Sequence, residues 1–224
     1  MIIQSSLSNL LLRALSASDF ATLAVSLTRV ELPRRCELVL PNQVIEHCWF
    51  PEEGIASIVA TSSDDHEAEA GVVGRDGVVD VATVLGIGAS TNYCVIQVSG
   101  YAHRVPADAL KGLLNASADA RRVFNGYAYS LLTQVSNTAL ANATYTVEQR
   151  LARWLLICSD RVGRDEIALT HDLLSIMLNV RRAGVTTTIQ SLVRLGALTV
   201  RRGVIVITDR EALTRLVPGG YTPI

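Results

Sequence analysis

The pattern of apolar and polar positions changes its period along the chain. Before about residue 107, short apolar segments are separated by proline and glycine, as at Pro33, Pro51 and Gly54. Many short segments with turn signals roughly every 8–12 residues are typical of a β-barrel or sandwich. After residue 107 the apolar positions recur at helical spacing, so the chain divides into a β part and a helical part.

The first 20 residues form an exception within the β part. They predict an amphipathic helix, because one apolar side recurs at Leu7, Leu11, Leu15 and Phe20. A secretion signal is not expected, since the start has no basic segment and Arg13 interrupts the apolar stretch. No apolar run reaches the ~18 residues of a membrane span, so we expect no membrane association.

The helical part opens with one long element. We expect a helix from about Ser117 to Ala143, with an apolar stripe at Phe124, Ala128, Leu131, Val135 and Thr138. A long helix with one moderately apolar stripe packs either on a copy of itself or on its own barrel. The sequence leaves both arrangements open.

The pattern after residue 145 predicts a winged helix-turn-helix. Thr146 and Gln149 form a capping box before a helix with a core stripe at Leu151, Trp154, Leu155 and Cys158. Thr170 caps the next helix, whose inward side is Leu173, Leu174 and Met177, and Asn179 marks a tight turn. A third helix, from about Arg181 to Leu195, buries Val185, Ile189, Leu192 and Val193.

Two strands around Arg202-Gly203 then form the wing of this fold. A second capping box, from Thr208 to Glu211, begins a last short helix.

The third helix carries the chemistry expected of a recognition helix. The N-terminal part of such a helix enters the DNA major groove. Arginines there bind guanine O6 and N7 or phosphate, and threonines offer hydroxyls to phosphate and methyl groups to thymine. The DNA-binding residues expected on this helix are Arg181, Arg182, Thr186 and Thr187, and Arg201 and Arg202 are expected to bind DNA from the wing.

The charge distribution is compatible with a nucleic-acid partner but does not establish one. The net charge of −1 conceals a difference, because residues 1–145 sum to −5 and residues 146–224 sum to +4. Such asymmetry indicates a DNA-binding region or simply two domains with uneven surfaces.

The composition excludes a disordered chain, with 49% hydrophobic and 18% charged residues. No cysteine pair has C-x-x-C spacing, so we expect reduced, buried thiols in a cytoplasmic protein at Cys36, Cys48, Cys94 and Cys158.

The stretch "LTHDLLSIMLNVRRAGVTTTIQSLVRLGAL" resembles, without a gap, the helix-turn-helix of the Crp/Fnr family of bacterial transcription regulators. "EQRLARWLL" resembles the preceding helix of the family, and "GVVGRDG", residues 71–77, resembles turns of its cyclic-nucleotide-binding barrel. The likeness extends over nearly the whole chain. It implies a homodimer that reads a two-fold-symmetric promoter site, with RNA polymerase as a candidate further partner.

The resemblance carries over to individual DNA-binding residues only in part. Thr170 and Arg181 fall where the family touches phosphate, and Arg182 falls on its base-reading arginine. Thr187 falls where another contacting side chain is common. Directly after the base-reading arginine, the family usually has a glutamate. Here that position is Ala183, so the resemblance does not imply the family's usual half-site sequence.

The ligand site departs further from the family. A cyclic-nucleotide pocket needs an arginine for the cyclic phosphate, but Thr91-Asn92-Tyr93 occupies that place and no arginine occurs between Arg75 and Arg104. Asp80 could replace the ribose-binding glutamate, although a carboxylate alone repels a phosphate. We therefore expect no response to cyclic AMP or cyclic GMP, and the effector stays open.

Another sensing chemistry or an enzyme activity would be an alternative function for this chain. No cofactor is expected, because the family's cluster-binding cysteines are absent and the four histidines (His47, His66, His103, His171) are scattered singly. The acidic run 64–67 is either a cation site or a solvated hairpin tip. No G-x-S-x-G, Walker or H-E-x-x-H motif occurs, so we expect no enzyme. The rival to a DNA-binding regulator is a ligand-binding or redox- or haem-sensing module centred on the barrel.

The expected fold class is α+β. Residues 1–116 would form a jelly-roll, cyclic-nucleotide-binding-like barrel, residues 117–145 a dimerisation helix, and residues 146–224 the winged helix-turn-helix.

Overall fold

The N-terminal segment is helical, but it is not one continuous helix. The computed structural model describes residues 2–64 and 66–223, apart from the side chain of Asp172. A short 3-10 turn η1 (Gln4–Ser6) precedes helices α1 (Leu10–Ala14) and α2 (Ala17–Ala24). The prediction of a single helix was wrong, because Leu15 is extended and the Ser16 side chain caps α2. The predicted apolar side is nevertheless buried at all four positions.

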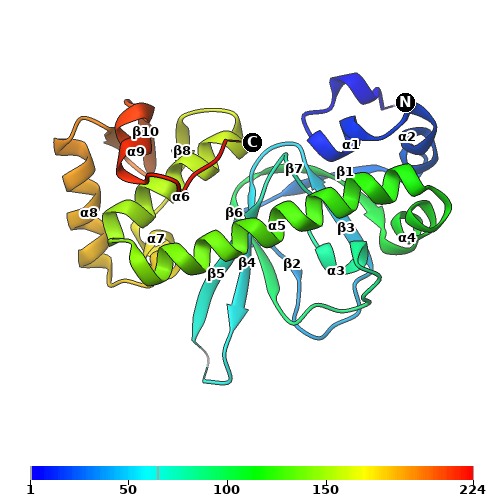
Figure 1. Cartoon of the computed structure of the whole chain (residues 1–224), viewed down its shortest axis with the longest axis horizontal. Coiled ribbons are helices and arrows are strands. Elements are labelled where there is room, and N and C mark those ends of the chain that lie inside the picture. The colour runs from blue at the N-terminus through cyan, green and yellow to red at the C-terminus, as the bar shows by residue number, and fades with distance from the viewer. Residues whose placement is uncertain (1, 65, 224) are drawn as a thin grey trace.

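Two antiparallel sheets form the barrel, as predicted (Figure 1). One sheet has the order β1-β7-β3 and the other β2-β6-β4-β5. The strands are β1 (Thr28–Leu32), β2 (Glu37–Val39), β3 (His47–Pro51), β4 (Ile55–Thr61), β5 (Glu67–Val73), β6 (Tyr93–Val98) and β7 (Gly100–Pro106). Alternating side chains of both sheets, among them Leu32, Ala56, Ile96 and Ala102, fill the space between them. A single helical turn, α3 (Val81–Val84), lies in the β5–β6 connection.

Helix α4 (Ala107–Ala116) leads into the long helix α5 (Ala118–Thr144), which crosses the whole molecule in Figure 1. The predicted bounds of this helix are confirmed, and Ser117 caps it through Ala120 N. Its predicted stripe faces the chain's own barrel, since Phe124 and Leu131 are buried and Leu131 and Val135 approach Gly71 of β5. Of the two arrangements left open by the sequence, this stripe therefore packs on the chain's own barrel and not on a second copy.

The C-terminal part is the predicted winged helix-turn-helix. Its elements are α6 (Val147–Val162), β8 (Glu166–Ala168), α7 (His171–Leu178), α8 (Arg182–Arg194), β9 (Leu198–Arg201), β10 (Val204–Ile207) and α9 (Arg210–Leu216). The strand β8, which the sequence did not indicate, pairs with β10 and makes the wing a three-stranded sheet of order β8-β10-β9. The capping box at α6 is confirmed. The second one is wrong by one residue, because Asp209 and not Thr208 caps α9.

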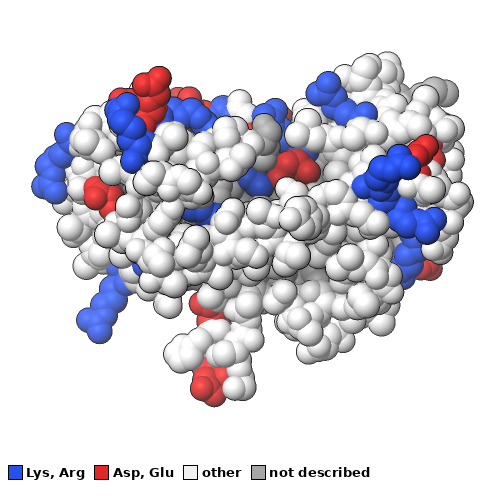
Figure 2. Space-filling view, in the orientation of Figure 1, with Lys and Arg blue, Asp and Glu red and all other residues white. Residues whose placement is uncertain are grey.

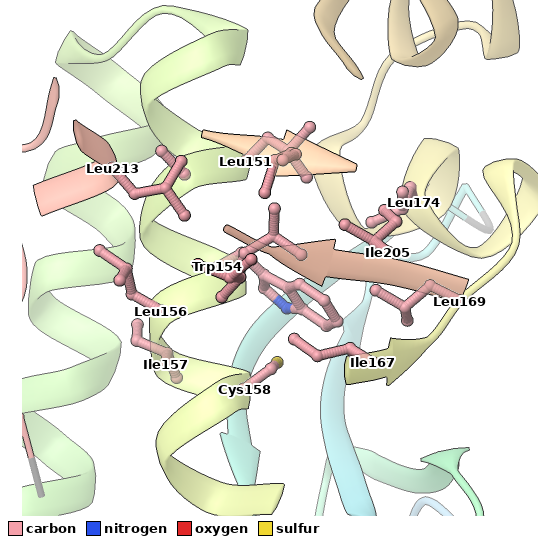
Figure 3. Close-up of a cluster of buried hydrophobic side chains, with 14 of the residues drawn as sticks. Leu151, Trp154, Leu156, Ile157, Cys158, Ile167, Leu169, Leu174, Ile205 and Leu213 are labelled. Atoms are coloured by element: carbon pink, nitrogen blue, oxygen red, sulfur yellow. The ribbon is translucent and has the colours of Figure 1, made fainter. Parts of the chain in front are cut away.

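The core of this part is continuous with the outer surface of the barrel. Figure 3 shows Trp154 of α6 surrounded by apolar side chains from α6, β8, α7, β10 and α9. Ile55, Val72 and Val98 of the barrel belong to the same cluster. The Trp154 indole also donates a hydrogen bond from Nε1 to Oε1 of Glu69 on β5, at 2.7 Å. The helix-turn-helix is thus held against the barrel by both apolar packing and a polar bond.

Candidate DNA-binding surface

The turn between α7 and α8 is fixed by backbone geometry. Asn179 has a positive φ of 48°, which asparagine tolerates better than most residues, and its N–H caps α7 through the carbonyls of Ser175 and Ile176. Leu174 of α7 and Val185 and Ile189 of α8 are buried in the shared core. This packing holds α8 at the end of the molecule farthest from the N-terminal helices (Figure 1).

The N-terminus of α8 presents two arginines to solvent. Arg181 is the N-cap residue and Arg182 the first helical residue, and both are exposed. The unpaired N–H groups at a helix N-terminus carry partial positive charge and bind phosphate well. Two guanidinium groups at that end make it a strongly favourable place for a DNA backbone or a guanine edge.

The three threonines of α8 bond first of all to their own helix. The hydroxyls of Thr186, Thr187 and Thr188 donate to the carbonyls of Arg182, Ala183 and Gly184, at 3.2, 3.1 and 2.8 Å. Such bonds are the usual solution for threonine inside a helix. In this state the hydroxyl oxygens can still accept from base N–H groups, but a bond to phosphate requires the hydroxyl to rotate.

Thr186 and Thr187 have different surroundings. The Thr186 hydroxyl also lies 3.1 Å from Nδ1 of His171, so it joins α8 to the start of α7. Thr187 is exposed. Of the two predicted contact residues, Thr187 is therefore the more accessible to DNA. Sequence reasoning missed His171, because a lone histidine gives no pairing signal.

Thr170 holds the start of α7 and also touches the barrel. Its hydroxyl oxygen accepts from Leu173 N at 3.4 Å and from a guanidinium nitrogen of Arg34 at 2.8 Å. Arg34 lies in the turn between β1 and β2. Both acceptor positions of the hydroxyl are thus used, and its hydrogen remains for a phosphate oxygen. No local pattern in the sequence points to Arg34, which is 136 residues away.

The wing adds the last two predicted residues. Arg201 ends β9, and Arg202 lies in the β9–β10 turn, which Gly203 closes with a φ of 74°. Arg201 lies 3.8 Å from Glu166 of β8, with about 74% of its side chain exposed. An ion pair so exposed contributes little stability, so Arg201 can exchange it for phosphate at small cost.

Together, α7, α8 and the wing bring the predicted residues onto one domain. Arg181 and Arg182 lie at the start of α8, and Thr186, one turn further along, contacts His171 at the start of α7. One core assignment in this region was wrong: Val193 is 40% exposed. It follows the buried Leu192 directly, and neighbouring positions on a helix point in directions about 100° apart.

A small cavity lies where the resemblance would place a cyclic-nucleotide pocket in the barrel. The cavity lined by Asp80, Asn92 and Tyr93 has a volume of about 60 Å³, whereas small-molecule sites usually measure ~300–1,000 Å³. Asp80 turns inward to cap α3, accepting bonds from the backbone and hydroxyl of Thr83. Burial raises the pKa of this carboxyl, because a buried site stabilises negative charge poorly.

Three of the four cysteines lie in the interior of the protein. Cys48, Cys94 and Cys158 are buried, and burial raises the pKa of all three thiols, that of Cys48 to about 12. A thiol is reactive only as the thiolate, so these three are unreactive as they stand. The prediction of a buried thiol at Cys36 was wrong, because this residue lies in the turn just before β2 and is partly exposed.

The acidic run was a further candidate, as a cation site. Within residues 2–64 and 66–223, no three His, Cys, Asp or Glu side chains come together as a metal site; Asp65 of the acidic run lies outside these residues. In the same ranges, no helix is long and apolar enough to cross a membrane.

Comparison with known domain families gives a match in the C-terminal part of the chain. Residues 149–216 match the model of the Crp-like helix-turn-helix domain. This range runs from the first turn of α6 to the end of α9 and contains α7, α8 and the wing. Among curated proteins, none matches the chain.

Solved structures share the whole architecture at low sequence identity. FixK2 from Bradyrhizobium japonicum is similar with a TM-score of 0.73 and 15% identity, over 85% of this chain and 97% of that one. The c-di-GMP-responsive global regulator CLP from Xanthomonas campestris has a TM-score of 0.67 and 17% identity, over 87% and 100%. A transcriptional regulator of the CRP/FNR family from Thermus thermophilus has a TM-score of 0.64 and 16% identity, over 84% and 97%.

Proposed function

We propose that this chain, which has the fold of the Crp/Fnr regulators and a Crp-like helix-turn-helix domain, is a homodimeric transcription regulator that binds a two-fold-symmetric promoter site. The main support for the proposal is the exposed N-terminus of α8, with Arg181 and Arg182. This helix belongs to a domain that matches the Crp-like helix-turn-helix model, and the core of that domain holds it at the surface. In this proposal the protein has no catalytic activity and acts in the cytoplasm, where promoter DNA is found.

The outer face of α5 supports the dimer. Residues 123–147 contain no charged residue, and Figure 2 shows the middle of the helix as a white band across the molecule. Tyr129, Leu132 and Leu140 are 72%, 60% and 57% exposed there. Their spacing of three and eight residues places them on one stripe of the helix. An uncharged apolar stripe of this length favours pairing with a second copy.

Pairing along α5 would place two α8 helices on one face of the dimer. A two-fold dimer of this kind reads half-sites about one DNA turn apart, ~34 Å. Thr170, Arg181 and the wing arginines Arg201 and Arg202 then bind phosphates and set the register. Arg182, Thr186 and Thr187 face base edges, with Arg182 on a guanine.

The barrel in this proposal does not respond to cyclic AMP or cyclic GMP. The absence of an arginine at Thr91 or Asn92 and the volume of the remaining cavity support this. Calorimetric titration with either nucleotide should give no saturable heat, and micromolar binding of either one would contradict it.

Selection of bound fragments from genomic DNA tests DNA recognition and yields the site. Titrations of variants against that site and a scrambled duplex, at low and high salt, then separate the residue roles. Arg182→Ala should lower affinity for the true site and flatten the preference at one guanine per half-site, a discrimination of ~1–3 kcal/mol.

Two further variants act as matched comparisons. Arg181→Ala should weaken both duplexes alike and reduce the salt slope by ~1 per half-site. Thr170→Ala should also weaken both alike and lose ~1 kcal/mol of stability through the cap. If Arg181→Ala erased the preference and Arg182→Ala did not, the register of α8 on DNA would be shifted by one residue. If no fragment were enriched, DNA recognition itself would be refuted.

A further inference from the structure

A large cavity lies outside the barrel, where the DNA-binding domain meets the long helix. Its volume is about 550 Å³, within the ~300–1,000 Å³ typical of small-molecule sites. α5 forms one wall with Ser130, Thr133 and Asn137, and α6 forms another with Arg153 and Arg161. The C-terminal segment 220–223 closes a third side. Figure 2 shows basic and acidic side chains meeting above the middle of α5.

The two arginines of the cavity are deeply buried. Arg153 is 7% exposed and Arg161 is 5% exposed. Taking a guanidinium group out of water is costly unless an anion or several hydrogen bonds compensate it. The hydrogen-bond and ion-pair partners of each guanidinium group therefore show whether its charge is compensated within the protein.

Arg161 has its counter-ion within the protein. One of its guanidinium nitrogens lies 2.7 Å from Oδ2 of Asp76, and another donates to the carbonyl of Ile157 at 3.1 Å. Its Nε is buried without a hydrogen-bond partner in the described part of the chain. The charge of Arg161 is thus neutralised, although its donors are not all used.

Arg153 has no such directly bonded counter-ion among the described residues. Its Nε donates to the carbonyl of Gly220 at 2.8 Å and another nitrogen to the Thr138 hydroxyl at 3.3 Å, both neutral acceptors. Among the described residues, no carboxylate lies within 4.0 Å of it, and Asp76 is the one acid in the cavity wall. Burial lowers the pKa of Arg153. The described side chains that line the cavity therefore carry one positive charge in excess, and Glu69 acts on Arg153 only from outside that lining.

We propose that this cavity binds a small, hydroxylated organic oxyanion, a phosphate ester or a hydroxycarboxylate, whose anionic group pairs with Arg153. The planar guanidinium group fits either oxyanion. The neutral polar side chains of α5 line the space beside it and suit hydroxyl groups on the rest of the ligand. Because the site lies between α5, α6 and the C-terminal segment, a bound ligand contacts both the long helix and the DNA-binding domain.

Direct titration of the full chain without DNA tests this proposal. The probes are glycerol 3-phosphate and citrate, with glycerol as the uncharged control, followed by calorimetry. At least one anion should bind saturably and glycerol should not, and the relative affinity of the two anions distinguishes a phosphate site from a carboxylate site. Lack of saturable binding by both anions up to about 10 mM would overturn the proposal.

Variants locate the binding. Arg153→Gln should weaken binding of the anion at least about tenfold, which is the effect of losing one charge-assisted hydrogen bond. Arg121→Gln, which removes the same charge from the far end of α5, should leave binding unchanged. Ser130→Phe places a large side chain in the cavity from α5 and keeps both arginines. It should weaken binding to a similar extent, and it tests the site independently if Arg153→Gln does not fold.

Unchanged binding in a folded Arg153→Gln or Ser130→Phe variant would place the anion elsewhere and refute the site. Because these measurements contain no DNA, their failure leaves the proposed DNA recognition untouched.

Discussion

At the scale of single residues, Glu69 shows how one carboxyl group joins the barrel to the DNA-binding domain. It accepts hydrogen bonds from Ser57, Gln97 and Trp154, at 2.6, 2.9 and 2.7 Å. These bonds favour the charged form, but burial outweighs them and raises the pKa of Glu69 to about 7. The folded protein therefore holds a proton on Glu69 more tightly than the unfolded chain does.

This difference predicts a dependence of stability on pH. The contribution of Glu69 is fully present below its unfolded pKa of about 4.3 and is lost as the pH rises towards 7. Glu69→Gln, which removes the titrating carboxyl but keeps only one of its two accepting oxygens, should gain stability relative to the wild type as the pH rises through that window, by at most ~1.4 kcal/mol per pH unit. Urea unfolding at several pH values measures it.

Glu67→Gln, at the exposed end of the same strand, is the control and should follow the wild-type profile. Parallel profiles for the wild type and Glu69→Gln would show that the Glu69 carboxyl does not titrate in this range.

At the scale of elements, helix ends are set by side chains next to them. Thr146 and Gln149 bond reciprocally at the start of α6, at 3.2 and 3.0 Å. Ser16, Ser117 and Asp209 cap α2, α5 and α9 in a similar way. Since α6 carries Trp154 into the core of the DNA-binding domain, its first turn fixes how that domain follows α5.

Removing the cap of α6 should cost stability. Thr146→Ala should lower the free energy of unfolding by about 1 kcal/mol, because the backbone N–H of Gln149 loses its acceptor. Chemical denaturation measures the change. Thr144→Ala provides the control two residues earlier, where the hydroxyl bonds to the Leu140 carbonyl inside α5. That change should be neutral or slightly stabilising, because alanine is the better helix former. Equal losses in both variants would exclude the capping box as the cause.

At the scale of the whole molecule, α5 has two apolar faces with different partners. The inner face, with Phe124 and Leu131, is buried against the rest of the chain. The outer face, with Tyr129, Leu132 and Leu140, is exposed in the single chain. A change at Leu131 therefore disturbs the fold, and a test of dimerisation must be made on the outer face.

Leu132→Glu should convert the proposed dimer into a folded monomer, because a carboxylate on the paired stripe loses its water without gaining a partner. Multi-angle light scattering should report the halved mass, and affinity for the two-fold site should fall with it. Leu85→Glu is a matched control, since Leu85 on the barrel has the same exposure of 60%. That variant should remain dimeric. A wild-type monomer that binds the full site with undiminished affinity would refute the proposed assembly.

The sequence by itself determined the elements whose signals are local. The capping box at Thr146, the turn at Asn179, the bounds of α5 and the wing around Gly203 each depend on residues a few positions apart. Hydrogen bonds and hydrophobic periods within one or two turns leave a direct pattern in the sequence. The family resemblance rests on the same local motifs, which is why the helix-turn-helix was predicted together with its core.

The tertiary structure alone decided which surfaces meet. The bond from Arg34 to Thr170, the bond from Trp154 to Glu69 and the cavity around Arg153 join residues far apart in the sequence. Their partners depend on how strands pair and how α6 lies on the barrel, so no spacing encodes them. The choice between the two faces of α5 has the same origin, because both faces are apolar and only the position of the barrel separates the buried side from the exposed one.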